Sequence, residues 1–136
     1  MEEQHVKFAN VEFEIESSVD SADLFKYLDK DILLSHRAKL ENGNEFVSFC
    51  LKKAFRTPDA TIDAFCSMIE RLPPHERDIW DGCEERRFDI GFESGNAKRA
   101  LCSKIAKDTV RRVSEISGSI VITIYPTSVK YRLVRP

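Results

Sequence analysis

The chain has 136 residues and a formal net charge of −2, with 42% hydrophobic and 32% charged residues. This size and balance exclude a disordered or fibrous chain, and they predict a single domain over residues 1–136 that folds without disulfides or a structural metal. No apolar run approaches the roughly 18 residues of a membrane span, and the acidic opening MEEQHVKF is unlike a signal peptide. We therefore expect a cytoplasmic protein that contacts no membrane.

The first third of the chain is rich in alternating, strand-like segments. Apolar residues recur at every second position over residues 6–8 and 11–15, with a change of parity between them that indicates a strand with a bulge, or else two short strands. Residues 34–40 and 46–51 flank an Asn-Gly pair, Asn42-Gly43, which is a strong hairpin signal. These segments predict at least three strands.

Two helices are predicted among these strands. A short helix begins near residue 21, and its Leu24, Tyr27 and Leu28 share one face. The clearer helix opens at Thr57-Pro58, with threonine as the cap and proline at the first helical position. Its apolar residues follow at helical spacing: Ile62, Phe65, Cys66, Ile69 and Leu72.

The remaining elements complete the predicted order. We expect a helical turn at residues 76–80, a strand at 87–92, and a long amphipathic helix at 97–116 that ends at a glycine. The β-branched run 119–125 is typical of a central strand covered on at least one face, and 129–133 is typical of an edge strand. The simplest packing is an α+β sandwich, in which two main helices cover one face of a mixed, mostly antiparallel sheet.

The cysteines, histidines and glycines form no recognised catalytic or cofactor motif. Four cysteines lie far apart without a CxxC pair, which favours reduced thiols: Cys50, Cys66, Cys83 and Cys102. Cys66 and Cys102 each lie on the apolar face of a predicted helix. The glycines form no phosphate loop, and the histidines lie on different elements. We expect neither a cofactor nor a metal.

Residues 75–95 place the only tryptophan of the chain among carboxylates. Trp80 lies close in sequence to Asp78, Asp81, Glu84 and Glu85. A tryptophan in such surroundings can anchor a protein interface, and these five residues are our candidate partner interface. The commoner arrangement is that Trp80 packs into the core and the carboxylates are solvated surface.

An enzyme is the alternative for the same stretch. Cys83 and His75 are near enough in sequence to form a nucleophile and base, and Asp78, Asp81 or Glu85 could supply a pair of carboxylates. The acidic side chains that follow Cys83 would raise its pKa, which disfavours the thiolate.

The charges are distributed unevenly along the chain. Residues 1–31 carry nine acidic and three basic side chains, whereas residues 96–136 carry two acidic and nine basic ones. The predicted helix at 97–116 has a basic face made by Lys98, Lys104, Lys107, Arg111 and Arg112. Without interleaved exposed aromatics, and with a pI near 5.9, this pattern indicates a solvated helix face, and we expect no direct binding of nucleic acid.

One family resemblance is carried by the segment IWDGCEERRFDIGFESG, by the helix after it and by SIVITIYP. Together they resemble the immunity proteins of bacterial polymorphic-toxin loci, such as contact-dependent growth inhibition and Rhs-type systems. The resemblance covers residues 72–126, and none of the matching positions is catalytic.

The resemblance implies an antitoxin that occludes a toxin domain stoichiometrically and performs no chemistry. The expected partner is a basic toxin domain, with a nuclease as one option, and the expected state is a monomer or weak dimer. If the carboxylates around Trp80 do not make the contact, the acidic segment 12–31 is the next choice. A structural or oligomeric domain that pairs through 129–133 is the remaining alternative.

Overall fold

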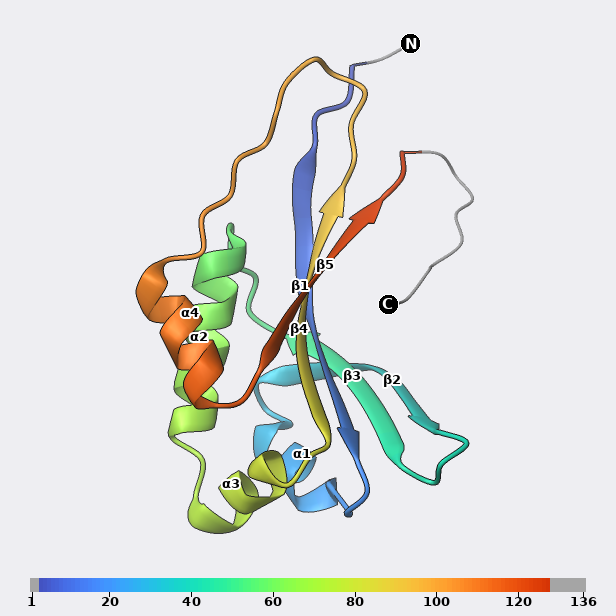
Figure 1. Ribbon diagram of the computed structural model, residues 1–136, viewed down its shortest axis with the longest axis vertical. Helices are drawn as coiled ribbons and strands as arrows, with labels where there is room; N and C mark the ends of the chain where they lie inside the picture. Colours follow the sequence, from blue (N-terminus) through green and yellow to red (C-terminus); the bar gives the residue numbers. More distant parts are fainter. Residues whose placement is uncertain (1–2, 128–136) are drawn as a thin grey trace.

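The computed structural model describes residues 3–127, which form one α+β unit around a single core (Figure 1). Its elements in chain order are β1 (Lys7–Ser17), α1 (Ala22–Leu28), β2 (Ile32–Lys39), β3 (Glu45–Leu51), α2 (Pro58–Glu70), α3 (Pro74–Asp81), β4 (Glu85–Glu93), α4 (Lys107–Glu115) and β5 (Ser119–Tyr125). None of the helices in this range is long and apolar enough to cross a bilayer.

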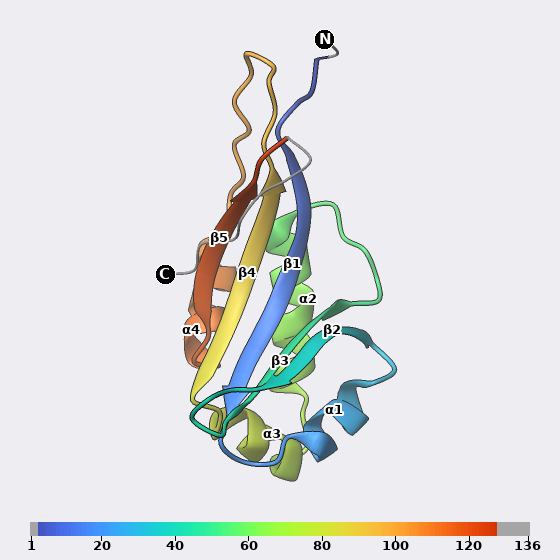
Figure 2. The same cartoon turned by 90° about the vertical axis from the view of Figure 1, so that its right-hand side faces the viewer.

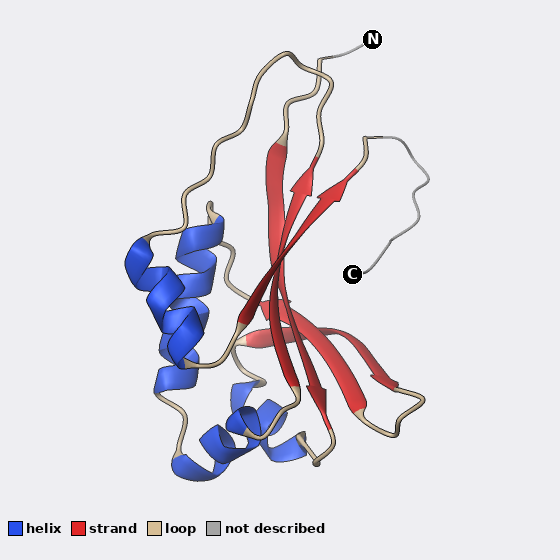
Figure 3. Ribbon diagram, in the orientation of Figure 1, coloured by secondary structure: helices blue, strands red, loops and turns tan. Residues whose placement is uncertain are grey.

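The described strands form a sheet in the order β2-β3-β1-β4-β5. The pairs β2–β3, β3–β1 and β1–β4 are antiparallel, and β4–β5 is parallel, with α4 in the connection. Helices α2 and α4 cover one face, while α1 and α3 lie together at one end (Figure 3). The predicted fold class, a mostly antiparallel sheet with two main helices on one face, is confirmed.

Both local signals in the strands are confirmed. The register of β1 against β4 shifts between Phe8 and Asn10, where the sequence changes parity. At the β2–β3 turn, Gly43 has φ +88°, a conformation that glycine adopts without steric cost. The amide of Leu40 donates to the carbonyl of Asn44 at 2.8 Å and closes the hairpin.

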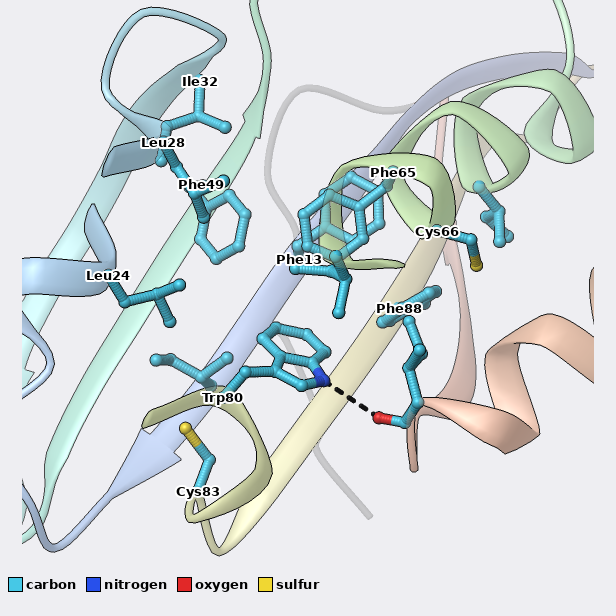
Figure 4. Close-up of a cluster of buried hydrophobic side chains, with 14 of the residues drawn as sticks. Phe13, Leu24, Leu28, Ile32, Phe49, Phe65, Cys66, Trp80, Cys83 and Phe88 are labelled. Atoms are coloured by element: carbon cyan, nitrogen blue, oxygen red, sulfur yellow. Dashed lines mark hydrogen bonds between the residues drawn. The ribbon is translucent and has the colours of Figure 1, made fainter. Parts of the chain in front are cut away.

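Helix α2 begins and packs as its sequence predicts. The Thr57 hydroxyl oxygen accepts a hydrogen bond from the amide of Ala60 at 3.1 Å, which satisfies one of the amides at the start of the helix. Its apolar stripe is buried, and Phe65 is the centre of an aromatic cluster (Figure 4). The Phe65 ring lies 3.9 Å from that of Phe13 and 5.3 Å from that of Phe88, measured between centroids.

The short helix α1 also forms, but with a different buried face. Leu24, Phe25 and Leu28 are buried, whereas Tyr27 is exposed. The prediction that Tyr27 shares the inner face is therefore wrong. Phe25 packs its ring against that of Phe49, at 5.3 Å between centroids, and so takes the inward place.

The predicted helix at 97–116 is wrong over its first half. Helix α4 begins at Lys107, and residues 94–106 follow an irregular path, so Cys102 is exposed and lies on no helix face. A helix from residue 97 would put Lys98 and Arg99 at its positive N-terminal end, which the helix dipole disfavours. Starting at Lys107 places Asp108 in the first turn, which the dipole favours.

Within residues 3–127, residues 119–125 do not take the central position predicted for them. β5 is the last strand of the described sheet, and its Ile122 and Ile124 are exposed by 63% and 66%. Continuous β-branched sequence is typical of buried strands, but it does not say which neighbours a strand has. The edge strand predicted at 129–133 lies outside the described residues.

Candidate partner-binding surface

Trp80 is a core residue. Its side chain is 1% exposed, and its ring meets that of Phe65 edge-on at 5.6 Å between centroids. The indole nitrogen donates a hydrogen bond to the carbonyl of Ile116 at 3.0 Å (Figure 4). The assignment of Trp80 to a partner interface is therefore corrected, because a side chain buried in this way is not available to anchor a partner.

The four carboxylates around Trp80 are exposed but do not form one surface of equivalent groups. Asp81 accepts a 3.0 Å hydrogen bond from Arg77, one helical turn earlier. Glu84 accepts hydrogen bonds from the hydroxyl and, at 2.7 Å, from the amide of Ser18. The hydroxyl bond is the main reason that the pKa of Glu84 is lowered. Two of the four carboxylates are thus already engaged within the chain.

The other two carboxylates lie in different parts of the fold. Asp78 lines a hollow between α1 and α3 together with Asp20, Asp23 and His75. Glu85 is the first residue of β4 and lies directly opposite Glu16 of β1. Of the predicted interface residues, only Glu85 thus belongs to the sheet.

The structure does not bring Cys83 and His75 together as a nucleophile and base. His75 is exposed and contacts Asp23 at 2.9 Å, which is the main reason that its pKa is raised. Cys83 is buried and donates its thiol hydrogen to the carbonyl of Ile79 at 3.3 Å. Burial raises the pKa of Cys83, and it raises that of Cys66 to about 12, so thiolates are disfavoured at both sites.

The sheet has a face turned away from α2 and α4, and Figure 2 shows this face toward the viewer. Charged residues of β1 and β4 gather on it. Every second residue of β1 from 12 to 16 is a glutamate, and each lies directly opposite a charged residue of β4. The register pairs Glu12 with Asp89, Glu14 with Arg87, and Glu16 with Glu85. This group therefore combines five carboxylates with a single guanidinium. We call these six residues the acidic face.

Uncharged side chains donate hydrogen bonds to three carboxylates of the acidic face. Glu16 accepts a 2.8 Å hydrogen bond from the side-chain amide of Asn44. The hydroxyl of Thr123 donates to Asp89 at 2.7 Å. Ser48 donates to Glu12 at 3.3 Å. Amide and hydroxyl donors satisfy lone pairs but bring no positive charge, so the negative charge of this face is not compensated by them.

A shallow hollow of about 400 Å³ opens on the acidic face. Its wall combines charged residues with apolar ones contributed by the β2–β3 hairpin and by β5. The lining residues are Glu14, Glu16, His36, Ala38, Leu40, Phe46, Arg87 and Val121. Glu14 is only 3% exposed, so the carboxylate at the centre of β1 is withdrawn into the floor. The hollow therefore places apolar side chains next to the half-buried carboxylate of Glu16 and the guanidinium of Arg87.

The sequence predicted only part of this surface. It named the acidic segment 12–31 as the second choice, but gave priority to the tryptophan. The signal was present in the alternation itself, since Val11, Phe13 and Ile15 turn toward the core. Residues of the opposite parity must share the other face, and between 12 and 16 all of them are glutamates.

The basic helix face predicted at 97–116 is not formed as such. Lys98 and Lys104 lie in the irregular segment before α4. Arg112, on α4, turns toward α2 and donates to Glu70 at 2.8 and 3.0 Å. It also pairs with Asp63, and its side chain is only 18% exposed. The cations are thus dispersed, and one of them holds two helices together.

Within residues 3–127, no group of three or more histidine, cysteine or acidic side chains is arranged to hold a metal ion. Comparison of the chain with protein family models, with curated proteins and with solved structures finds no match. The acidic face is therefore interpreted from its own geometry and charge.

Proposed function

We propose that this chain is a binding protein that holds a basic partner protein on its acidic face and performs no chemistry on it. More particularly, we propose that it is a cytoplasmic immunity protein, which neutralises a cognate bacterial toxin domain by occluding it. The resemblance of residues 72–126 to such proteins supports the particular form. The charge and shape of the sheet support the broader proposal, a protein that binds a basic partner.

The observation that carries the proposal is the pairing of like charges across β1 and β4. Glu12 lies opposite Asp89, and Glu16 lies opposite Glu85. Carboxylates directly opposite one another weaken a sheet, since they repel at close range. A partner that places lysine or arginine side chains over these pairs would remove the repulsion and gain charge-assisted hydrogen bonds. The arrangement costs stability in the isolated chain and favours a basic partner.

The geometry around the acidic face suits a protein partner. A sheet face is broad, and the hollow beside Phe46 and Val121 adds an apolar contact next to the carboxylates of the acidic face. Interfaces commonly combine an apolar centre with a polar edge. Electrostatic complementarity speeds association and selects the partner, which is what a cell needs when it neutralises a toxin before damage occurs.

Co-expression with the product of the neighbouring upstream gene tests the proposal. The expected result is a 1:1 complex that survives purification, together with protection of cells from that product when this chain is present. If the neighbouring gene encodes no toxin domain, or its product neither binds nor is inhibited, the immunity function is wrong.

A further inference from the structure

One edge of the described sheet is apolar and is not covered by the helices. β5 pairs with β4 on one side, and in the described residues no strand lies on its other side. Ile120, Ile122 and Ile124 are exposed by 39%, 63% and 66%. They lie beside Phe88, Ile90 and Phe92 of β4, in register, on the face that α2 and α4 cover elsewhere. The three isoleucines therefore continue the apolar, helix-facing side of the sheet as far as its edge.

β5 also lacks the charged residues and prolines that keep edge strands from pairing with other chains. Its sequence, Ser119–Tyr125, contains neither a charged residue nor a proline. The opposite edge strand, β2, carries His36, Arg37 and Lys39. Charges and prolines on edge strands discourage pairing with another chain, and natural proteins use them for that purpose. The two edges of this sheet are thus unlike, and β5 is the one suited to pairing.

The sequence of β5 is complementary to itself in an antiparallel register. If Ile122 lies opposite Ile122 of a second copy, Ile120 lies opposite Ile124, and Val121 lies opposite Thr123. Residues opposite each other share a face, so all six isoleucines would lie together on the helix side. Cross-strand pairs of β-branched residues stabilise a sheet.

We propose that β5 pairs with β5 of a second copy of this chain, antiparallel and about a two-fold axis at Ile122, so that one sheet runs through both protomers. The interface is isologous, as in most two-fold dimers. The pairing lies in the plane of the sheet and leaves the acidic face of each copy uncovered. The proposal is independent of the proposed immunity function.

A competing occupant is the segment 128–136, which begins three residues after the end of β5. That segment brings Lys130 and Arg132, whereas a second β5 brings an uncharged strand whose isoleucines match one for one. The self-complementarity of β5 therefore favours the second copy, and the experiments include removal of the segment.

The first experiment measures the mass of the full chain in solution over a range of concentrations, by light scattering or sedimentation. We expect a dimer whose self-association weakens about tenfold or more in Ile122→Lys, since two lysines would then face each other at the axis. Leu34→Lys is the matched control, because it places a lysine at an apolar residue that is 49% exposed on the opposite edge strand, and it should leave the dimer intact. Circular dichroism should confirm that both variants are folded.

The second experiment tests the register. In a Cys102→Ser background, Ile122→Cys should form an intermolecular disulfide on oxidation, because directly opposite residues have Cα atoms about 4.5–5.5 Å apart. Ile120→Cys alone should form none, whereas Ile120→Cys combined with Ile124→Cys should. A different pattern of cross-links overturns the proposed register.

Two results overturn the proposal as a whole. One is a wild-type chain that stays monomeric at high concentration, including the case in which removal of residues 128–136 makes it dimerise, since that segment would then be the occupant of the edge. The other is a wild-type dimer that Ile122→Lys does not weaken, since the interface would then lie elsewhere.

Discussion

The indole nitrogen of Trp80 donates a 3.0 Å hydrogen bond to the backbone carbonyl of Ile116, and so joins the end of α3 to the end of α4. The chain turns sharply just after this carbonyl, where Ser117 has φ +59°. Arg86 of β4 donates to the carbonyl of Ser117 at 3.0 Å and holds the same turn from another side. Trp80, which the sequence suggested as an interface residue, thus helps to position the start of β5 through this hydrogen bond.

We predict that Trp80→Ala lowers the free energy of unfolding by about 3–5 kcal/mol, as large-to-small changes of buried aromatics do. Trp80→Phe should cost less, about 1–3 kcal/mol, since it keeps a ring but leaves the Ile116 carbonyl without its donor. Chemical denaturation measures both. Tyr27→Ala, which removes an exposed aromatic, is the control and should change stability by no more than about 0.5 kcal/mol. If Trp80→Ala is as mild as Tyr27→Ala, the indole is not a core residue.

Arg112 provides a second test of how α4 is held. Its guanidinium spans α2, where it meets Ser67 at 2.7 Å as well as Glu70 and Asp63. Arg112→Met keeps the stem but removes these charge-assisted hydrogen bonds, and we expect it to cost about 1–3 kcal/mol. Arg111→Met, which breaks an exposed pair with Glu115 on the same helix, should cost no more than about 1 kcal/mol.

The cost of Arg112→Met should also depend on pH. The hydrogen bond from Arg112 is the main reason that the pKa of Glu70 is lowered from its ordinary value of 4.5. A lowered carboxyl pKa stabilises the fold fully above 4.5, and that stabilisation is lost as the pH falls through the folded-state value. Urea unfolding of both chains from pH 7 to pH 3 should therefore show a difference that shrinks on acidification. A constant difference would assign the effect to packing alone.

The contact between His75 and Asp23 predicts the opposite pH dependence. Asp23 raises the pKa of His75 above its ordinary value of 6.5, and the pair links α3 to α1. Its stabilisation is complete below 6.5 and is lost as the pH rises through the folded-state pKa. We expect His75→Gln to be less stable than wild type at pH 6 and equal to it at about pH 9. An NMR titration should place the His75 pKa above 6.5, and Asp23→Asn should lower it.

The sequence predicted local features better than it predicted neighbours. The bulge in β1, the Asn-Gly turn and the Thr57 cap depend on a few adjacent residues, and all three are confirmed. The prediction of a helix at 97–116 was wrong over its first half, because it was based on apolar spacing and took no account of the basic residues at the predicted start. In the described part of the chain, β5 is the last strand of the sheet and not a central one, because burial depends on which strand lies alongside, and the whole sheet decides that.

The candidate site was also predicted poorly, because it depends on which strands are neighbours. Carboxylates near Trp80 in sequence are spread over α3, the loop after it and the start of β4. The acidic face gathers residues 12–16 with residues 85–89, which are far apart in the chain. Only the register of β1 against β4 places Glu12 opposite Asp89, and no spacing within either segment reveals it.

Thiol reactivity tests the enzymatic alternative. We expect Cys102 to react first with a maleimide at neutral pH, because it is the exposed cysteine of the four. Cys66 and Cys83 should react slowly, since burial raises the pKa of both thiols and blocks access. Mass spectrometry of partially labelled protein ranks the four sites, and Cys102→Ser should remove the fast phase. Fast labelling of Cys83 would return the nucleophile hypothesis to consideration.

Removing carboxylates from the acidic face should raise the stability of the isolated chain and slow its association with the partner. Glu12→Gln and Glu16→Gln each replace one member of an opposed carboxylate pair, and glutamine can still accept the hydrogen bonds from Ser48 and Asn44. Each change should raise the free energy of unfolding by about 0.2–1 kcal/mol at pH 7, because a repulsion across the strands is removed.

The double variant that combines Glu12→Gln with Glu16→Gln should bind the partner more slowly, with a weaker dependence of the association rate on salt, since fewer charges steer the encounter. Asp78→Asn with Asp81→Asn is the matched control, because it also removes two carboxylates but leaves the acidic face intact. Stopped-flow measurements at low and high salt compare the two variants with wild type. A double variant that is more stable yet slower to bind means that the opposed pairs are kept for recognition at the expense of the fold. If the control variant is the slower one, the partner docks at α3, and the acidic face is ordinary solvated surface.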